Sequence, residues 1–275
     1  MTLRGNVVLV TGASRGLGRA IALELARAGA RLLLSARDAR ALADTAEQVA
    51  GARVIAADLS RPEEVERLAA ACRAEAGRID ALVNNAGVLG PLGAFEDAAP
   101  DAWREVFQVN LFAPARLSQL LIPGMRALGR GKIVNVSGGG AATARPHVTA
   151  YAASKAALVR LTESLAEELT GSGIDVNAVA PGPLATRMMD ELLAAPAEAL
   201  PREHERLRTQ AAASPARAAQ LIAWLLSAES DGISGRLLSA QWDDWQALGA
   251  RRAELVESDV YTLRRVRPAD RGKRW

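Results

Sequence analysis

Residues 6–18 of the chain read Asn-Val-Val-Leu-Val-Thr-Gly-Ala-Ser-Arg-Gly-Leu-Gly. Residues 6–10 form a short, almost entirely apolar run, which is typical of a strand buried on both faces of a parallel sheet. Gly12, Gly16 and Gly18 follow in the spacing G-x-x-x-G-x-G, and an apolar helical pattern comes next. Glycines let a backbone approach a pyrophosphate, and a helix N-terminus offers it free N–H groups. The stretch predicts a strand–loop–helix unit that holds a dinucleotide, with a simple tight turn as the alternative.

The alternation of strand and helix continues from this unit to about residue 240. The first helix is expected to end at Gly29, and further helices are predicted at 38–50, 62–76 and 100–128. One more helix is predicted to contain residues 151–155 and to end at about residue 170. Strands are predicted at 31–35, 53–57, 81–83, 132–136, 174–180 and 237–240. Such alternation indicates the α/β class, with a doubly wound parallel sheet covered by helices on both faces. We therefore predict a single domain over residues 1–240, followed by a C-terminal extension over residues 241–275.

Polar and glycine-rich stretches stand at the carboxyl ends of the predicted strands. They are residues 11–18, 58, 84–87, 137–140 and 181–186. In open parallel sheets, ligands bind beyond the carboxyl ends of the strands. We therefore expect these stretches to converge on one crevice, and the functional site to lie there.

The composition argues against several other classes of protein. The 275 residues include 34 Lys plus Arg and 31 Asp plus Glu, and the resulting charge of +3 is scattered, so we expect no nucleic-acid partner. The single cysteine, Cys72, and the two histidines provide neither a disulfide framework nor a metal site. We find no targeting pattern and no apolar run that could span a bilayer, so we expect a cytoplasmic protein. The basic residues 271–274 are expected to form a solvated end.

Residues 151–155, Tyr-Ala-Ala-Ser-Lys, place a tyrosine and a lysine four residues apart in a predicted helix. The two side chains therefore project from one face, about one turn apart. An ammonium near a phenol favours the phenolate and lowers the pKa of the tyrosine. Tyr151 could then exchange a proton near neutral pH. The same spacing also occurs in helices where the pair has no function.

In their order and spacing, these motifs resemble the short-chain dehydrogenase/reductase family. The matching elements are TGASRGLG (11–18), Asp58, NNAG (84–87), Asn110, YAASK (151–155) and PGPLAT (181–186). The resemblance covers residues 1–240 and implies a Rossmann-type fold with a seven-stranded parallel sheet. It also implies a nicotinamide cofactor, a small-molecule carbonyl or alcohol as substrate, and a homodimer or homotetramer.

The resemblance also implies roles for individual residues. Tyr151 would be the acid/base, Lys155 would lower its pKa and bind the nicotinamide ribose, and Asn110 would hold a water in a proton relay. Asn85 would only tie loops together. The cofactor-binding residues that the resemblance implies are Gly12, Ser14, Arg15, Gly16, Leu17, Gly18, Arg37, Asp58, Leu59, Asn84, Ala86, Gly87, Tyr151, Lys155, Pro181, Gly182 and Thr186.

The end of the second predicted strand indicates which cofactor is bound. Family members that use NAD usually have an aspartate there, whereas this chain has Ala36 followed by Arg37. Arg15 lies nearby in the glycine loop. Guanidinium groups bind phosphate with paired hydrogen bonds, so two arginines favour the 2′-phosphate of NADP(H) over NAD(H). Asp38, the next residue, is interpreted as the N-cap of the following helix.

The chain differs from the family pattern at one catalytic position. The family serine stands 13 residues before the tyrosine, where this chain has Gly138, and Ser137 lies one residue early. A shift of one residue on a strand moves a side chain to the other face. The glycines at 138–140 could turn Ser137 into the site or expose N–H groups in its place, and Thr143 and Thr149 are further candidates. We assign Ser137 to the catalytic set with Asn110, Tyr151 and Lys155.

These inferences predict an NADPH-dependent oxidoreductase that interconverts a carbonyl and an alcohol. Because Gly138 replaces the serine, the alternative is a catalytically impaired NADP-binding sensor or assembly protein.

Two further segments have open interpretations. The extension contains Trp242, Trp245 and Trp275 and a predicted helix at 246–258; it could cap the site, add to the core or contact a second subunit. The segment between Pro183 and Pro215 is predicted to be helical, with Met188 and Met189 as walls of a substrate pocket. Its arginines at 187, 202, 206 and 208 and its histidine at 204 could bind an anionic substrate or form a solvated face, and we favour the solvated face.

Overall fold

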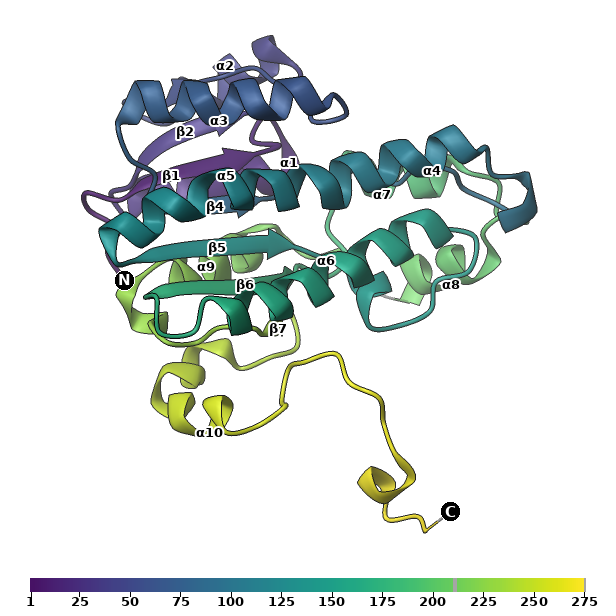
Figure 1. The fold of residues 1–275 in the computed structure, drawn as a ribbon. Helices are drawn as coiled ribbons and strands as arrows, with labels where there is room; N and C mark the ends of the chain where they lie inside the picture. The colour runs from purple at the N-terminus through teal and green to yellow at the C-terminus, as the bar shows by residue number, and fades with distance from the viewer. Residues whose placement is uncertain (210–211, 275) are drawn as a thin grey trace.

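The computed structural model describes residues 1–209 and 212–274, and its centre is a seven-stranded parallel sheet. The strands are β1 (Val7–Thr11), β2 (Arg31–Ser35), β3 (Arg53–Val54), β4 (Ala81–Asn84), β5 (Gly131–Val136), β6 (Ile174–Ala180) and β7 (Leu237–Ser239). Their order in the sheet is β3-β2-β1-β4-β5-β6-β7. The chain starts in the middle of the sheet and winds outward from β1 to β3. It then crosses back to place β4 on the other side of β1, and β5, β6 and β7 follow outward from there. The predicted Rossmann-type, doubly wound α/β fold is confirmed (Figure 1).

Helices cover both faces of the sheet because its strands are apolar on both faces. In β1, Val8 and Val10 join one core cluster while Val7 and Leu9 join another. The first cluster contains buried residues of α1 (Gly16–Arg27), α2 (Ala39–Ala46) and α9 (Ala216–Leu225), and the second those of α3 (Pro62–Ala76), α5 (Ala113–Leu128) and α6 (Thr149–Glu168). This two-sided burial is the reason that the strands are continuous apolar runs in the sequence.

The predicted helix over 100–128 is interrupted in the structure. It consists of α4 (Pro100–Phe107), a π-helical turn (Gln108–Phe112) and α5. Asn110 lies in the π turn and is fully buried. π turns inside α-helices often occur at functional sites, and apolar periodicity does not reveal them.

Other boundaries differ modestly from the prediction. Helix α2 ends at Ala46 rather than at residue 50, and β3 has two residues rather than five. The pairing of β3 with β2 nevertheless continues through hydrogen bonds from Ile55 N to Leu34 O and from Ala57 N to Ala36 O. Helix α9 was not predicted, because seven of its ten residues are buried and only the exposed Arg217 and Gln220 mark its polar side.

Helices α7 (Arg187–Ala194) and α8 (Pro201–Thr209) lie beyond the carboxyl ends of the strands, on the side toward α4 (Figure 1). They belong to the segment that the sequence predicted to be helical. Their position places them over the end of the sheet where the glycine-rich stretches lie.

The first part of the C-terminal extension belongs to the core. Instead of one helix over 246–258, it forms a 3-10 helix (Trp245–Arg251) and α10 (Arg252–Val256). Trp245, Leu248 and Leu255 are buried in the core cluster of α9, and the ring of Trp245 lies 6.0 Å from that of Trp224. The chain then passes along β7, where Tyr261 O accepts a hydrogen bond from Leu237 N at 2.8 Å. Beyond this contact it runs away from the sheet (Figure 1) and ends in exposed basic residues at 271–274, as predicted. Trp275 lies outside the described residues.

Candidate active site

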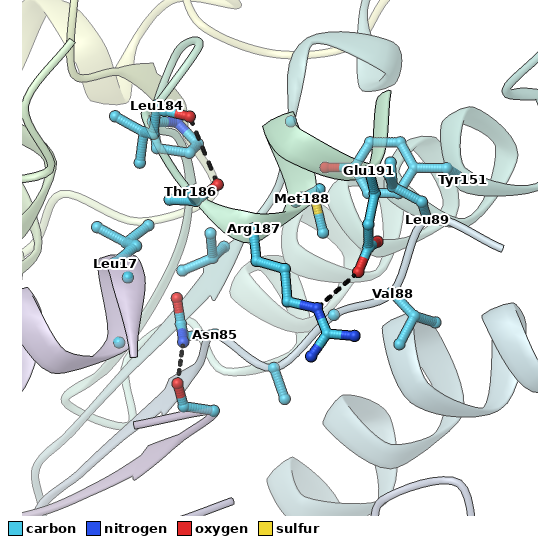
Figure 2. Close-up of a pocket in the computed structure, with 18 of the residues that line it drawn as sticks. Leu17, Asn85, Val88, Leu89, Tyr151, Leu184, Thr186, Arg187, Met188 and Glu191 are labelled. Atoms are coloured by element: carbon cyan, nitrogen blue, oxygen red, sulfur yellow. Dashed lines mark hydrogen bonds and ion pairs between the residues drawn. The ribbon is translucent and has the colours of Figure 1, made fainter. Parts of the chain in front are cut away.

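A cavity of about 930 Å³ opens beyond the carboxyl ends of the strands. Residues from all five predicted stretches line it, and α7 and α8 contribute its outer wall. Figure 2 shows Leu17 and Asn85 on the strand side and Met188 and Tyr151 toward the other end. The predicted convergence on one crevice is therefore present in the structure. It follows from the parallel sheet, which brings all strand ends to one edge.

The glycine loop packs tightly at one end of this cavity. A Cβ on Gly18 would lie 2.0 Å from Gly12 O, and a Cβ on Gly12, where φ is +65°, would lie 2.9 Å from Ala86 Cα. Asn85 Nδ2 donates to Thr11 O at 2.9 Å and to Gly12 O at 3.2 Å, the second of which is drawn in Figure 2, so its predicted loop-tying role is confirmed. Only glycine fits at these two positions of the loop.

The N-terminus of α1 is available to an anionic ligand. Its N-cap, Arg15, makes no side-chain cap, so the N–H groups of the first turn have no partner within the helix. Gly16, Leu17 and Gly18 of this turn line the cavity. Free N–H groups and the positive end of the helix dipole suit a pyrophosphate, so the residues present fit a dinucleotide.

Two arginines lie near the carboxyl end of β2. Arg15 and Arg37 both line the cavity, and Arg15 Nη2 lies 3.8 Å from Asp38 Oδ2. Asp38 Oδ1 accepts a hydrogen bond from Ala41 N at 3.0 Å, so its predicted role as the N-cap of α2 is confirmed. The carboxylate of Asp38 is thus occupied by the helix terminus and by Arg15.

Of the predicted cofactor residues, all line the cavity except Asn84. Asn84 Nδ2 instead donates to Asn135 Oδ1 at 2.8 Å, within the sheet between β4 and β5. The implied role of Asn84 in cofactor binding therefore stays a prediction, and its side-chain amide is already bonded within the sheet. Asn84 is the last residue of β4, and its side chain still belongs to the interior.

Tyr151 and Lys155 lie on adjacent turns of α6, and both are buried along the cavity. Lys155 Nζ donates to Val136 O at 2.8 Å and lies 5.8 Å from the centroid of the Tyr151 ring. Burial raises the pKa of Tyr151, against the charges of Arg145 and Arg206, and burial lowers the pKa of Lys155 to about 8. The expected lowering of the Tyr151 pKa by Lys155 is therefore corrected: burial outweighs the neighbouring cations, and the phenol is held protonated at neutral pH.

The side chain of Asn110 connects the loop after β4 to α6, next to this pair. Its Nδ2 donates to Val88 O at 2.9 Å and to Ser154 Oγ at 3.0 Å, and its Oδ1 accepts from Val88 N at 2.9 Å. Ser154 Oγ in turn donates to Tyr151 O at 2.8 Å. Asn110 does not line the cavity. Its observed contacts position α6, and its role in a water relay stays a prediction.

Gly138 directly faces the Tyr151 hydroxyl. A Cβ on Gly138 would lie 2.5 Å from Tyr151 Oη, so the phenol occupies the room that a serine side chain would need. Ser137 is buried and lines the cavity, and its Oγ has no hydrogen-bond partner among the described residues. Thr143 and Thr149 do not line the cavity. Of these three candidates, only Ser137 lines the cavity, and its Oγ is buried.

The other end of the cavity has an apolar wall. Tyr151, Leu89, Leu192 and Leu200 are buried in one cluster, against which Met188 and Leu207 pack (Figure 2). Met188 and Met189 both line the cavity, where the sequence analysis placed a substrate pocket. Arg187 pairs with Glu191 at 3.1 Å on the exposed side of α7.

The sequence analysis did not identify the cluster of Arg145, Glu203 and Arg206. Arg145 Nε and Nη2 lie 2.8 and 2.5 Å from the two oxygens of Glu203, and Arg206 Nη2 lies 2.9 Å from Glu203 Oε2. Arg206 was expected on a solvated face, yet it lines the cavity together with Arg145. Only the spacing of Glu203 and Arg206, three residues apart on a helix, could have suggested a pair; no pattern linked either to Arg145.

Within the described residues, His, Cys, Asp and Glu side chains form no group of three that could hold a metal ion. In the same part of the chain, no helix has the length and apolar character needed to cross a membrane.

Comparison with known proteins gives consistent matches. A family model described as short chain dehydrogenase matches residues 6–197. The chain is 33% identical over 270 residues to the short chain dehydrogenase pigC of Monascus ruber, covering 94% of this chain and 85% of that protein. It is 40% identical over 195 residues to the rhamnolipids biosynthesis 3-oxoacyl-acyl-carrier-protein reductase of Pseudomonas aeruginosa, covering 68% and 76% of the two chains. The solved Pseudomonas aeruginosa RhlG/NADP active-site complex superposes with a TM-score of 0.77 at 34% identity, covering 86% and 95%.

Proposed function

The chain belongs to the short-chain dehydrogenase/reductase family, and we propose that it is an NADPH-dependent reductase that interconverts a carbonyl and an alcohol. One observation carries this proposal. Tyr151 and Lys155 lie buried on one face of α6, in the same cavity as the uncapped N-terminus of α1. A proton donor and a dinucleotide cradle in one cavity suit hydride transfer coupled to proton transfer.

In reduction, the bound nicotinamide would supply the hydride to the carbonyl carbon. Tyr151, which burial keeps protonated, would donate its phenol proton to the substrate oxygen. Lys155, with a pKa near 8, is mostly charged at pH 7 and would stabilise the phenolate that remains. Ser137 Oγ, which has no partner among the described residues, is our candidate for a hydrogen bond to the substrate oxygen.

The preference for NADPH is supported by Arg15 and Arg37, because both line the cavity beside the end of β2. Asp38 does not compete strongly for a ribose, since its carboxylate caps α2. A solved relative of this chain is described as a complex with NADP. The cofactor site would therefore select the 2′-phosphate by charge.

Removal of the Tyr151 hydroxyl tests the mechanism. NADPH oxidation should be followed with a panel of ketones and aldehydes, using wild type and Tyr151→Phe. We expect turnover by the wild type and a loss of about 10²- to 10⁴-fold in the variant, with NADPH binding in a fluorescence titration within about twofold of wild type. Normal turnover of Tyr151→Phe would contradict the mechanism.

A second candidate function rests on Gly138. If the lost serine marks lost catalysis, the protein is an NADP-binding sensor or assembly partner. NADPH binding without oxidation by any carbonyl in the panel would favour that function.

We also propose a homodimer or homotetramer that works in the cytoplasm. The rings of Phe95, Trp103, Phe107 and Phe112 form a row with neighbouring centroids 5.7, 5.8 and 6.4 Å apart, and Phe95 and Phe112 are exposed. This row runs along α4 and the turns that flank it and is exposed at both ends, which supports a subunit contact there. The single cysteine, Cys72, is buried and free, which suits a reducing compartment. Light scattering on the purified protein measures the oligomeric state.

A further inference from the structure

The cluster of Arg145, Glu203 and Arg206 has more positive than negative charge. Two guanidinium groups share one carboxylate, and the side chains of Arg145 and Glu203 are only 10% and 3% exposed. Burial by itself would raise the pKa of Glu203, but the hydrogen bonds and charges of the two arginines hold it below its usual value. Glu203 is therefore ionised, and the cluster has a net charge of about +1 at neutral pH.

Both arginines keep hydrogen-bond donors that the protein does not use. Each guanidinium has five N–H groups. Arg145 and Arg206 each direct Nε and Nη2 toward Glu203. No described residue accepts a hydrogen bond from Nη1 of either arginine. These outer groups belong to side chains that line the cavity, so a ligand there can use them.

The cluster is adjacent to the reacting group. Arg145 Cζ lies 5.6 Å from the centroid of the Tyr151 ring. Around the ring stand the buried side chains of Leu89, Leu192 and Leu200. An unbalanced charge is costly in such an apolar environment, and a ligand of opposite charge relieves that cost.

The acidic residues of the cavity do not neutralise this charge. Of the five acidic residues that line the cavity, Asp38 and Asp58 follow β2 and β3, where Asp38 pairs with Arg15 and caps α2, and Asp58 accepts hydrogen bonds from Ser60. The other three, Glu105, Asp190 and Glu191, are exposed, and Glu191 pairs with Arg187. Solvent screens charges at such positions. The buried end of the cavity therefore remains positive.

We propose that the substrate is a carbonyl compound that carries an anionic group a few bonds from the carbonyl, bound by Arg145 and Arg206. The inference rests on the proposed reductase function and names its substrate class. A carboxylate suits the geometry best, because its two oxygens can accept from the outer nitrogens of the two guanidinium groups, and the apolar wall takes the carbon chain. A phosphate shares this chemistry and is an arm of the test.

The same contacts allow a structural role, in which Arg145 and Glu203 only hold α8 over the cavity. The two roles differ in what they do to neutral substrates. A holding contact affects charged and neutral ketones alike, whereas an anion site affects only the charged ones.

The test compares matched substrates that differ in charge. Reduction of 4-oxopentanoate and 5-oxohexanoate is measured beside their methyl esters, and dihydroxyacetone phosphate beside dihydroxyacetone, in wild type, Arg206→Gln and Arg208→Gln. Arg208 is the matched control, because it lies on the same helix, is exposed and does not line the cavity. Arg206→Lys keeps the positive charge but lacks the paired N–H donors of the guanidinium group, and it replaces Arg206→Gln in the test if the glutamine variant does not fold.

We expect the wild type to prefer at least one anionic ketone over its neutral partner by about tenfold or more in kcat/KM. In Arg206→Gln this ratio should fall by about 10- to 100-fold, mainly through KM, and in Arg208→Gln it should stay unchanged. Equal rates for acid and ester in the wild type would overturn the proposal. An equal loss on both substrates in Arg206→Gln would overturn it in favour of the holding contact.

A binding measurement separates this inference from the reductase function. Hexanoate and hexanamide are titrated by calorimetry into the protein saturated with NADP⁺. If wild type binds hexanoate more tightly than hexanamide, and Arg206→Gln abolishes this difference, the anion site is supported. This holds even if the protein reduces no carbonyl, and in that case only the reductase function is contradicted. Equal binding of the acid and the amide would overturn the anion site, whatever the kinetics show.

Discussion

The two ends of the cavity are built by different means. At the end of β1, the cavity is formed by backbone groups of the glycine loop, which is packed so tightly that a Cβ on Gly18 would lie 2.0 Å from Gly12 O. At the end near Tyr151, the cavity is formed by side chains: Arg145 comes from the loop before α6, and Glu203 and Arg206 come from α8. The backbone end can hold one kind of ligand group, whereas a few substitutions can redesign the side-chain end. This difference suits an enzyme whose cofactor is fixed and whose substrate is not.

The largest effect on this comparison is expected from Gly18→Ala. The new methyl group has no room against Gly12 O, so the loop must shift and the N–H groups of α1 move with it. We expect NADPH affinity to fall about 100-fold in a fluorescence titration. Gly124→Ala is the control, because a Cβ there meets nothing within 4 Å. Unchanged affinity in Gly18→Ala would mean that the loop is more adaptable than its packing indicates.

Lys155 lies between the two ends, and its replacement is expected to change the stability of the folded protein. Burial lowers the pKa of Lys155 from its usual value of 10.5 to about 8, so folding must bury a charge at pH 7. That cost is fully present below pH 8, decreases between pH 8 and 10.5, and is absent above, and it amounts to about 3 kcal/mol at pH 7. Lys155→Met also loses the hydrogen bond to Val136 O, worth about 1 kcal/mol, so we expect a net gain of about 2 kcal/mol at pH 7 and almost none at pH 9.5.

Urea unfolding at the two pH values measures this gain. Lys132→Met is the matched control, because Lys132 Nζ lies 2.7 Å from both Asp175 and Asp231 and its loss should destabilise the protein. A loss of stability in Lys155→Met at pH 7 would show that the buried ammonium is better compensated than its surroundings indicate.

Arg37→Ala tests whether the cofactor end selects by charge. We expect NADPH affinity to fall about tenfold and NADH affinity to change little, since only NADPH carries the 2′-phosphate. Parallel titrations of both nucleotides measure the ratio. Arg40→Ala is the control, because Arg40 is exposed on α2 and does not line the cavity. An equal effect on both nucleotides, or a preference for NADH in the wild type, would contradict the proposed role of Arg37.

The smallest effect is expected from Gly138→Ser at the side-chain end. Although it restores the family's residue type, its Cβ would lie 2.5 Å from Tyr151 Oη, and the ring must move to admit it. We expect kcat to fall by about two- to tenfold in steady-state assays rather than to rise. Gly139→Ser is the control, because a Cβ there meets nothing within 4 Å. A rise in kcat would instead identify the missing hydroxyl as the limit on turnover.

Local patterns were sufficient for most of the fold. Strands such as Arg31–Ser35 and Ile174–Ala180 and the helix Pro62–Ala76 have the predicted bounds, because each combines an apolar pattern with clear end signals. The π turn around Asn110 was missed because it leaves no periodic signal of its own, and α9 was missed because its polar side consists of only two residues, Arg217 and Gln220. The partner of the Asn84 side chain was not predicted, because a motif lists residues without saying which way the last residue of a strand points.

The sequence by itself determined the sheet, the glycine loop and the Tyr151–Lys155 pair, because each depends on residues close together in the chain. Only the tertiary structure brought Arg145 against Glu203, 58 residues away. The same holds for Gly138 and the Tyr151 hydroxyl, whose closeness depends on the packing of α6 against the end of β5. Burial is likewise a property of the whole fold, and in this structure burial sets the direction of the pKa shifts of Tyr151 and Lys155. Short-range patterns encode elements and their order, while contacts and dielectric environment arise only when distant segments pack together.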